Sequence, residues 1–286
     1  MLQRIRKLLA QPGFRAEPLA VLWRGALWAS CVALGRSPVF TLTAGGERLR
    51  VPPDMRFTSV TAFLLRDWVE PELRALERFV GAGEVLVDVG ANIGLYALKG
   101  ARIVGPTGRV VAVEPGAVAS EMLAANLKLN PYFQQVDIVR KALADKVGQA
   151  TLHHIPLGDD PQAFSLLADG SADGETVETT TFDAMVADLG LPRVDCVKID
   201  VEGAEGMVLA GARETLRRWR PTVIFEVNCP TLLRRGDPRD VAWNLLAGYG
   251  YRFFRLEQGA LRPLDRMPEA FGNLIARHER RDSAGA

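Results

Sequence analysis

A short stretch in the first third of the chain constrains the fold most, because it combines a buried strand, a glycine turn and a helix. Residues 85–89 are valine-rich and apolar except for Asp88, as expected for a strand covered on both faces of a parallel sheet. Gly90 allows a sharp backbone turn, and apolar residues recur with helical spacing after Gly94. The chain is therefore predicted to be an α/β protein with a nucleotide-like ligand at this turn.

The turn differs from a dinucleotide-binding turn. Its glycines, Gly90 and Gly94, flank Asn92, and the third glycine of a dinucleotide site is absent. Asp88 would repel a phosphate but could accept a hydrogen bond from an ammonium group. Glu114 ends the next predicted strand, about 20 residues further on, where a carboxylate can bind both hydroxyls of a ribose. We therefore expect S-adenosylmethionine rather than NAD, with strand-end capping as the alternative role of both carboxylates.

Composition sets the size and the class of the protein. The 286 residues, 48% of them hydrophobic, suffice for one large α/β domain with an appendage. The net charge of +1 gives no indication of a nucleic-acid partner. Three cysteines without metal spacing, among them Cys196 in an apolar strand, indicate a reducing compartment, and we expect a cytoplasmic protein. With three histidines, the chain offers no His-rich metal site.

The chain is predicted to divide into an N-terminal extension over residues 1–58, a main domain over residues 59–280 and a flexible tail over residues 281–286. Within the extension, a helix is expected from Pro18 to Leu34, too short for a membrane span and interrupted by Arg24. It should pack on the main domain or on a second subunit. The alternative is an interfacial helix that contacts a membrane through Trp23, Leu27 and Trp28. A hairpin around Gly45 and Gly46 is predicted over residues 39–51.

Hydrophobic periodicity predicts the other elements. Helices are expected over residues 67–79, 117–129, 204–219 and 238–248. Strands are expected in the apolar run after Asp195 and over residues 109–114, 136–142, 149–155, 176–182, 222–227, 251–256 and 273–276. The polar loop over residues 156–175 is long enough to be functional, and we predict a lid over the acceptor. His154 borders this loop, either as a catalytic residue or as an ordinary strand residue.

A second group of polar residues follows two neighbouring predicted strands. Lys198, Asp200 and Glu202 lie at the carboxyl end of one strand, and Glu226 and Asn228 at the end of the next. Open α/β sheets place their ligands at this edge. The carboxylates could bind the hydroxyls of a substrate, act as a general base or hold a hard divalent cation.

These two groups carry a resemblance to a known family. The motifs Asp88-Val-Gly-Ala-Asn-Ile-Gly94 and Lys198-Ile-Asp-Val-Glu-Gly-Ala-Glu205, with Glu114-Pro115 between them, resemble the FkbM-type S-adenosylmethionine-dependent methyltransferases. The resemblance extends over roughly residues 63–276. It implies a Rossmann-like class I methyltransferase fold with seven strands, mostly parallel, of which the last is antiparallel. It also implies O-methylation of a hydroxyl on a sugar, glycolipid or polyketide-type natural product.

The sequence yields a hypothesis of in-line methyl transfer in which the protein mainly aligns the reactants and supplies a base. Cofactor-binding roles are predicted for Asp88, Gly90, Asn92, Gly94, Glu114 and, beside the adenine, Ala142. Asp200 is the leading residue near the transferred methyl, and weaker candidates for handling the proton are Lys198, Glu202 and His154. A metal-assisted alternative would hold Mg²⁺ with Asp200, Glu226 and Asn228.

Two other function classes stay open at this point. An NAD(P)-dependent oxidoreductase would share the sheet and the ribose carboxylate, and a non-catalytic cofactor-binding protein would lack an acceptor pocket. The expected partner is a small-molecule or glycan acceptor rather than a nucleic acid. Peripheral membrane contact and homo-oligomerisation are further possibilities of the extension.

Overall fold

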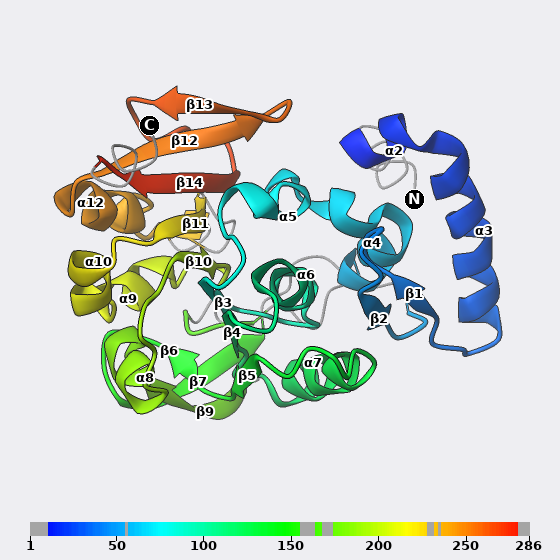
Figure 1. The fold of residues 1–286 in the computed structure, drawn as a ribbon, viewed down its shortest axis with the longest axis horizontal. Helices are drawn as coiled ribbons and strands as arrows, with labels where there is room; N and C mark the ends of the chain where they lie inside the picture. Colours follow the sequence, from blue (N-terminus) through cyan, green and yellow to red (C-terminus); the bar gives the residue numbers. More distant parts are fainter. Residues whose placement is uncertain are drawn as a thin grey trace.

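The computed structural model describes residues 11–54, 57–154, 164–167, 174–227, 232–233 and 236–279. Its centre is an eight-stranded sheet in the order β13-β12-β14-β11-β10-β3-β4-β5 (Figure 1). The strands are β3 (Val85–Val89), β4 (Arg109–Val113), β5 (Val136–Val139), β10 (Cys196–Ile199), β11 (Thr222–Val227), β12 (Tyr251–Glu257), β13 (Ala260–Leu264) and β14 (Gly272–His278). Pairing from β5 to β11 is parallel, and β14 pairs antiparallel with both β11 and β12.

The mostly parallel sheet with an antiparallel last strand is confirmed, but the sheet has eight strands rather than seven. The additional strand is β13, which forms an antiparallel hairpin with β12 at the edge of the sheet. Gln258 and Gly259 connect the two strands, both with positive φ, 47° and 77°. Sequence periodicity misses β13 because Pro263 weakens a strand prediction, although an edge strand tolerates a proline.

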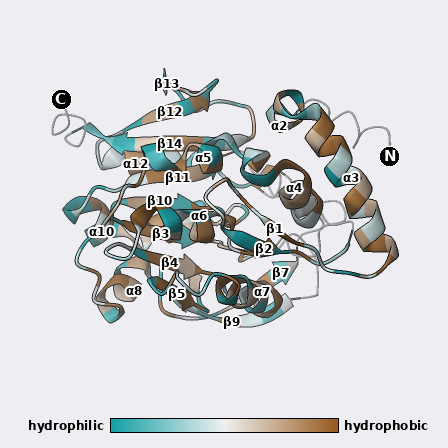
Figure 2. Cartoon of the chain, turned by 45° about the vertical axis from the view of Figure 1, so that its right-hand side comes forward, coloured by the Kyte–Doolittle hydropathy of each residue, from teal (hydrophilic) through white to brown (hydrophobic). Residues whose placement is uncertain are grey.

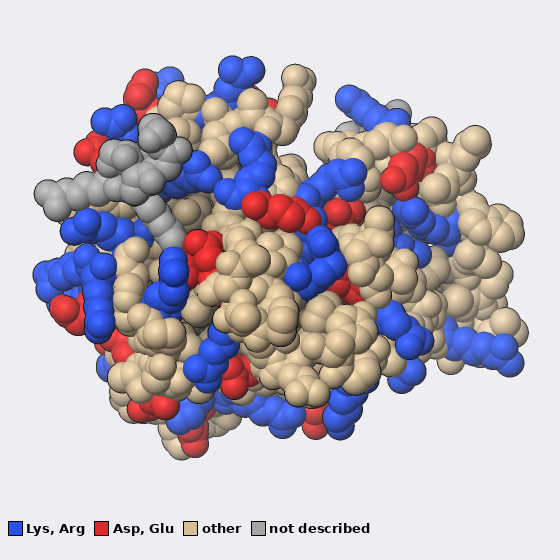
Figure 3. Space-filling model, in the orientation of Figure 1, with Lys and Arg blue, Asp and Glu red and all other residues tan. Residues whose placement is uncertain are grey.

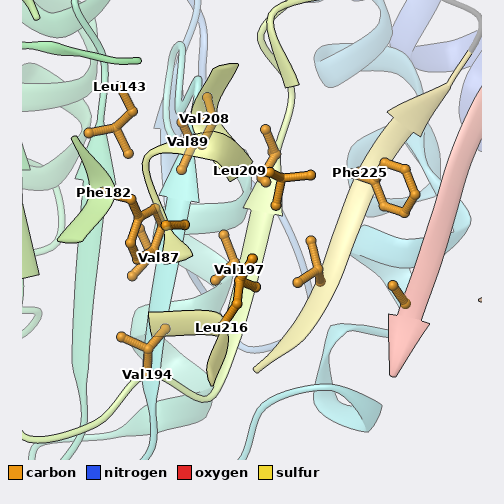
Figure 4. Close-up of a cluster of buried hydrophobic side chains, with 14 of the residues drawn as sticks. Val87, Val89, Leu143, Phe182, Val194, Val197, Val208, Leu209, Leu216 and Phe225 are labelled. Carbon is orange, nitrogen blue, oxygen red and sulfur yellow. The ribbon is translucent and has the colours of Figure 1, made fainter. Parts of the chain in front are cut away.

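Helices cover both faces of the sheet. One face packs against α8 (Phe182–Asp188), α9 (Glu205–Ala210), α10 (Arg213–Arg218) and α12 (Val241–Gly248). Figure 4 shows the resulting core, to which the sheet contributes Val87, Val197 and Phe225 and the helices contribute Phe182, Leu209 and Leu216. The opposite face packs against α5 (Pro71–Arg74), α6 (Leu95–Val104) and α7 (Ala117–Lys128). Because side chains alternate along β3, Val87 and Val89 face the first layer, whereas Asp88 faces α6 with Leu86.

Two predicted helices are broken in the structure. The helix expected over residues 67–79 is divided into η1 (Arg66–Val69), α5 and η2 (Leu76–Arg78). Pro71 disfavours helical geometry at Glu70, which is extended with φ −134° and ψ 138°. The helix expected over residues 204–219 is divided into α9 and α10. At Gly211, an added Cβ would lie 2.2 Å from the backbone oxygen of Ala144, so the chain turns there with no side chain.

A second, four-stranded sheet has the order β6-β9-β7-β8. It contains β6 (Ala142–Leu143), β7 (Gly148–His154), β8 (Phe164–Ser165) and β9 (Gly174–Thr180). The strands predicted over residues 149–155 and 176–182 are confirmed as β7 and β9. The strand predicted over residues 136–142 is two strands, β5 and β6, in different sheets. The predicted lid, residues 156–175, includes β8, but most of it lies outside the described residues.

The N-terminal extension contains α2 (Pro12–Ala16), α3 (Pro18–Ala33) and the hairpin of β1 (Val39–Thr41) and β2 (Arg48–Arg50), and α4 (Phe57–Leu65) follows across the predicted boundary at residue 58. The predicted helix and hairpin are thus confirmed. Trp28 of α3 packs on Phe63 of α4 with ring centroids 5.2 Å apart. Asn126 and Asn130 of the main domain accept hydrogen bonds from the backbone of β2, at 2.8 Å each. The extension therefore shares its core with the main domain.

Candidate active site

A cavity of about 900 Å³ opens at the carboxyl edge of the large sheet. It brings together most of the predicted site residues, namely Asp88, Gly90, Asn92, Glu114, Ala142, Lys198, Asp200, Glu202 and Glu226. Gly94 instead precedes the first residue of α6. The side chain of His154 and all of Asn228 lie outside the described residues. The cavity volume lies in the range of small-molecule and cofactor sites.

The turn after β3 forms one wall of this cavity. Gly90 has φ 80°, and an added Cβ would lie 1.9 Å from the backbone oxygen of Asp200, so no larger residue fits. The backbone N–H groups of Gly90 and Ala91 donate to the carbonyl of Val113, at 2.9 and 3.0 Å. The turn is thereby fixed against the ends of both β4 and β10.

Glu114 follows β4 and braces the same turn. Its Oε2 accepts a hydrogen bond from Asn92 N and its Oε1 from Gly116 N, both at 2.9 Å. Burial raises the pKa of Glu114 to about 7 against the opposing effect of these two backbone donors. Each carboxylate oxygen keeps a second lone pair, so the side chain can also accept hydrogen bonds from a ribose in the cavity.

Asp88 and Asn92 leave acceptor atoms unused at the cavity. Among the residues that the structure describes, neither Asp88 Oδ2 nor Asn92 Oδ1 has a hydrogen-bond partner. Asp88 is 2% exposed, and burial raises its pKa to about 7, while the charge of Lys198 lowers it. Buried acceptors without partners are costly unless a ligand satisfies them. The ammonium group of a ligand could donate a hydrogen bond to the unused oxygen of Asp88, as expected for S-adenosylmethionine.

Lys198 occupies the centre of a buried polar cluster on the floor of the cavity. It is 1% exposed, and its Nζ lies 2.9 Å from Asn273 Oδ1, 3.5 Å from Asp200 Oδ2 and 3.8 Å from Glu70 Oε2. Burial alone would lower the pKa of Lys198, but Asp200 and Glu70 raise it, so the ammonium is held charged. A permanently charged lysine cannot act as the base, which argues against the proton-accepting role considered for Lys198.

The cluster includes residues that sequence reasoning missed. Tyr96 donates a 2.6 Å hydrogen bond to Glu70 Oε2, and Asn273 Nδ2 donates to the same oxygen at 2.8 Å. Burial raises the pKa of Glu72, which also lines the cavity. Glu70 and Glu72 flank Pro71, the residue that breaks the predicted helix. The proline is the sequence feature that could have indicated that these two carboxylates leave the helix and reach the cavity. Asn273 had no signal, because only the pairing of β14 with β11 brings it opposite Glu226.

Asp200, Glu202 and Glu226 form the acidic side of the cavity. Burial and the charges of Asp200 and Glu202 raise the pKa of Glu226 well above its ordinary value. Its Oε2 has no hydrogen-bond partner within the described part of the chain. Asp200, with a side chain 34% exposed, is the more accessible carboxylate beside Lys198. The described residues contain no group of three or more His, Cys, Asp or Glu placed to hold a metal ion.

The strand order, the turn after β3 and the carboxylate after β4 define a Rossmann-like methyltransferase fold. Residues 88–253 match the family model described as the Methyltransferase FkbM domain. This match covers more than half of the chain, so the chain belongs to the FkbM family of S-adenosylmethionine-dependent methyltransferases.

Curated relatives share part of the sequence. AMB antimetabolite synthetase AmbE of Pseudomonas aeruginosa is 26% identical over 217 residues, which are 64% of this chain and 10% of that protein. The 31-O-demethyl-FK506 methyltransferase FkbM of Streptomyces tacrolimicus is 29% identical over 160 residues, 46% of this chain and 60% of that protein. Hexuronic acid methyltransferase AglP of Haloferax volcanii is 30% identical over 158 residues, 55% and 59% of the two chains. The chain thus spans less than two thirds of each of these relatives.

Replacing Glu114 by Gln tests the ribose contact. The amide of glutamine removes the charge and places an N–H donor beside the backbone donors of Asn92 and Gly116. The dissociation constant for S-adenosylhomocysteine should therefore rise about 10- to 100-fold, which corresponds to the loss of one or two charge-assisted hydrogen bonds. Isothermal titration calorimetry measures the change, and Glu121→Gln on the exposed face of α7 is the matched control. Equal affinity in Glu114→Gln and wild type would remove Glu114 from the cofactor site.

The raised pKa values predict an unusual pH dependence. Asp88 and Glu114 hold protons up to about pH 7 in the folded protein, whereas in the unfolded chain they lose them near pH 4. Their contribution to stability is therefore present at low pH and is lost as pH rises through about 7. The melting temperature of the ligand-free protein should fall, on the order of 5 °C, between about pH 5.5 and about pH 7.5. The affinity for S-adenosylhomocysteine should rise over the same interval, because the ionised carboxylates are the better acceptors. A flat profile for both quantities would contradict the assignment.

Proposed function

We propose that the protein is an O-methyltransferase that acts on a hydroxyl of a sugar, a glycolipid or a polyketide-type natural product. The observation that carries the proposal is that one cavity is lined by Asp88, whose Oδ2 has no partner among the described residues, by Glu114, and by Asp200 and Glu226. Two of the relatives above are named as methyltransferases of 31-O-demethyl-FK506 and of hexuronic acid. The family membership supports methyl transfer, and the acidic side of the cavity supports a hydroxyl acceptor.

The cofactor end of the cavity is assigned to the turn residues. Asp88 would hold the ammonium, Glu114 the ribose and Ala142 the adenine, while Gly90 and Asn92 shape the backbone around the amino-acid portion. When bound, S-adenosylmethionine supplies a methyl group already activated by its positive sulfur. The protein then has mainly to align and desolvate the reactants.

Asp200 and Glu226 have different roles in proton handling at the acceptor end of the cavity. Asp200 Oδ2 lies 3.5 Å from Lys198 Nζ, and its partly exposed carboxylate is placed to accept the proton of the acceptor hydroxyl. Burial favours the protonated form of Glu226, and in that form its carboxyl group can donate a hydrogen bond to an oxygen of the acceptor. Glu202 and His154 are the remaining candidates for proton transfer. Lys198 acts as a positioning residue that holds Asp200 in place.

Two further assignments complete the proposal. Asp200, Glu226 and Asn228 are the candidate oxygen ligands for a Mg²⁺ ion that would lower the pKa of the acceptor hydroxyl. A cytoplasmic location is supported by the cysteine content, three residues in 286 without metal spacing. Self-association and membrane contact concern the extension rather than the transfer site.

The proposal is tested by measuring S-adenosylhomocysteine production from S-adenosylmethionine with a panel of acceptors. The panel contains hexuronic acids, neutral glycosides and macrocyclic polyketide alcohols, each assayed with added Mg²⁺ and with a chelator. Amines and thiols of similar size are the controls for the reacting atom. Turnover with hydroxylated compounds alone would support the proposal. Methylation of an amine or a thiol in preference to every hydroxyl would overturn it.

A further inference from the structure

The outward face of α3 is an exposed apolar stripe. Its side chains recur every three or four residues and are strongly exposed, namely Leu19 (81%), Leu22 (60%), Trp23 (65%), Leu27 (40%) and, just past the helix, Leu34 (66%). Val21 and Trp28, on the opposite side, are buried against the rest of the extension. Figure 2 shows α3 as a mostly hydrophobic helix at the edge of the molecule. Apolar side chains gathered in this way on a surface mark an interaction site.

This stripe carries no charged side chain. Arg24 is the one charged residue in the sequence of α3, and it is directed inward. Its Nη1 donates to the carbonyl of Leu64 at 2.9 Å, and its Nη2 forms an ion pair of 3.0 Å with Glu17. In Figure 3 the right-hand edge, where α3 lies, is mostly free of colour, with basic side chains at its lower corner. Past the end of α3, Arg36 is exposed.

The charge of the chain is distributed unevenly around this helix. The first 38 residues contain six basic residues, Arg4, Arg6, Lys7, Arg15, Arg24 and Arg36, and one acidic residue, Glu17, a net charge of +5. The whole chain carries +1, so the remaining residues carry −4. A segment of sequence with a net positive charge that includes an apolar stripe and an exposed tryptophan matches an anionic lipid surface. It matches a second copy of this chain less well, because two basic segments would then face each other.

The length of α3 decides between lying on a membrane and crossing it. Its 16 residues extend over about 24 Å, less than the hydrocarbon core of a bilayer. Within the described residues, no helix is long and apolar enough to span a membrane. We propose that α3 docks the protein on an anionic membrane, with its axis in the plane of the surface and Leu22, Trp23 and Leu27 inserted among the lipids.

The docking face is connected to the active site through α4. Phe63 of α4 packs on Trp28 of α3, and Thr58 and Thr61 of α4 line the cavity. Two helix diameters, on the order of 20 Å, therefore separate the lipid surface from the cavity wall. This geometry favours the glycolipid among the proposed acceptors. That consequence rests on the proposed function, but the docking itself does not.

Vesicle co-sedimentation of the full chain tests the docking. Wild type should bind vesicles of phosphatidylcholine and phosphatidylserine, bind pure phosphatidylcholine vesicles much less, and dissociate as salt is raised. The variant Trp23→Glu/Leu27→Glu should bind the anionic vesicles at least about tenfold more weakly, because two apolar side chains no longer insert. Val147→Glu is the matched control, since Val147 is 70% exposed in the turn before β7.

Two further measurements make the outcome decisive. Affinity for S-adenosylhomocysteine should be equal in wild type and both variants, which shows that the variants fold and separates docking from methyl transfer. Light scattering after size exclusion reports the oligomeric state. Failure of wild type to bind anionic vesicles would overturn the proposal, as would equal vesicle binding by the double variant. A wild-type dimer that the double variant converts to a monomer, without vesicle binding, would assign the stripe to a second copy of the chain.

Discussion

Replacing Asp200 by Asn is expected to lower kcat by about 10²- to 10⁴-fold, the usual contribution of a general base. The amide is nearly isosteric, and it keeps an oxygen for Lys198, which lies 3.5 Å from Asp200 Oδ2. It cannot accept the proton of an acceptor hydroxyl. Asp88 and Glu114, the proposed cofactor ligands, belong to neighbouring parts of the sheet edge that the substitution leaves in place, so affinity for S-adenosylhomocysteine should change less than about threefold.

The matched control for this prediction is Asp188→Asn, because Asp188 is exposed at the end of α8. Its turnover should equal that of wild type. Single-turnover kinetics separates the chemical step from product release. Normal single-turnover rates in Asp200→Asn would remove Asp200 from the mechanism and leave Glu202 and His154 as the candidate bases.

Replacing Lys198 by Met should cause the largest loss of stability, with the free energy of unfolding falling by about 3–5 kcal/mol near neutral pH. Methionine fills a similar volume but leaves the carboxylates of Glu70 and Asp200 and the buried Asp88 without their cation. Removing one partner of a buried ionic cluster is costly because the remaining charges stay desolvated. The loss should shrink as pH falls below 7, since protonation of the buried Asp88, whose pKa is raised to about 7, removes one of the unpaired charges.

Urea-induced unfolding of Lys198→Met at two pH values measures this loss. Lys141→Met is the control, because Lys141 pairs with Glu178 on the surface, with side chains 47% and 63% exposed. An exposed pair of this kind contributes less than about 1 kcal/mol. A Lys198 variant as stable as the Lys141 variant at neutral pH would contradict the view that one buried cation holds the acidic floor of the cavity together.

The parts of the fold that follow from local chemistry could be predicted from the sequence. The valine run before Gly90 predicts β3, and the glycine turn predicts the start of α6, because each signal lies within one short segment. The carboxylate after β4 was placed correctly because parallel strands end at the same edge of the sheet. Helix capping is also a local signal. The side chain of Thr181 accepts a hydrogen bond from Ala184 N at the start of α8.

The parts that depend on tertiary contacts could not be predicted in this way. Asn273 joins the cavity only because β14 enters the sheet between β11 and β12. Glu70 approaches Lys198 only because Pro71 redirects the chain across the edge of the sheet. Trp28 was considered for membrane contact, yet it is 5% exposed and packs on Phe63, since a single helix does not show which of two apolar faces is covered.

Calorimetric titration of the purified wild-type protein with S-adenosylhomocysteine and, separately, with NAD tests the central claim most directly. The turn after β3 and the acidic side chains of Asp88 and Glu114 predict binding of S-adenosylhomocysteine in the micromolar range and no binding of NAD, whose pyrophosphate Asp88 would repel. Binding of NAD, or of neither ligand, would contradict the assignment of this turn to S-adenosylmethionine and the mechanism that depends on it.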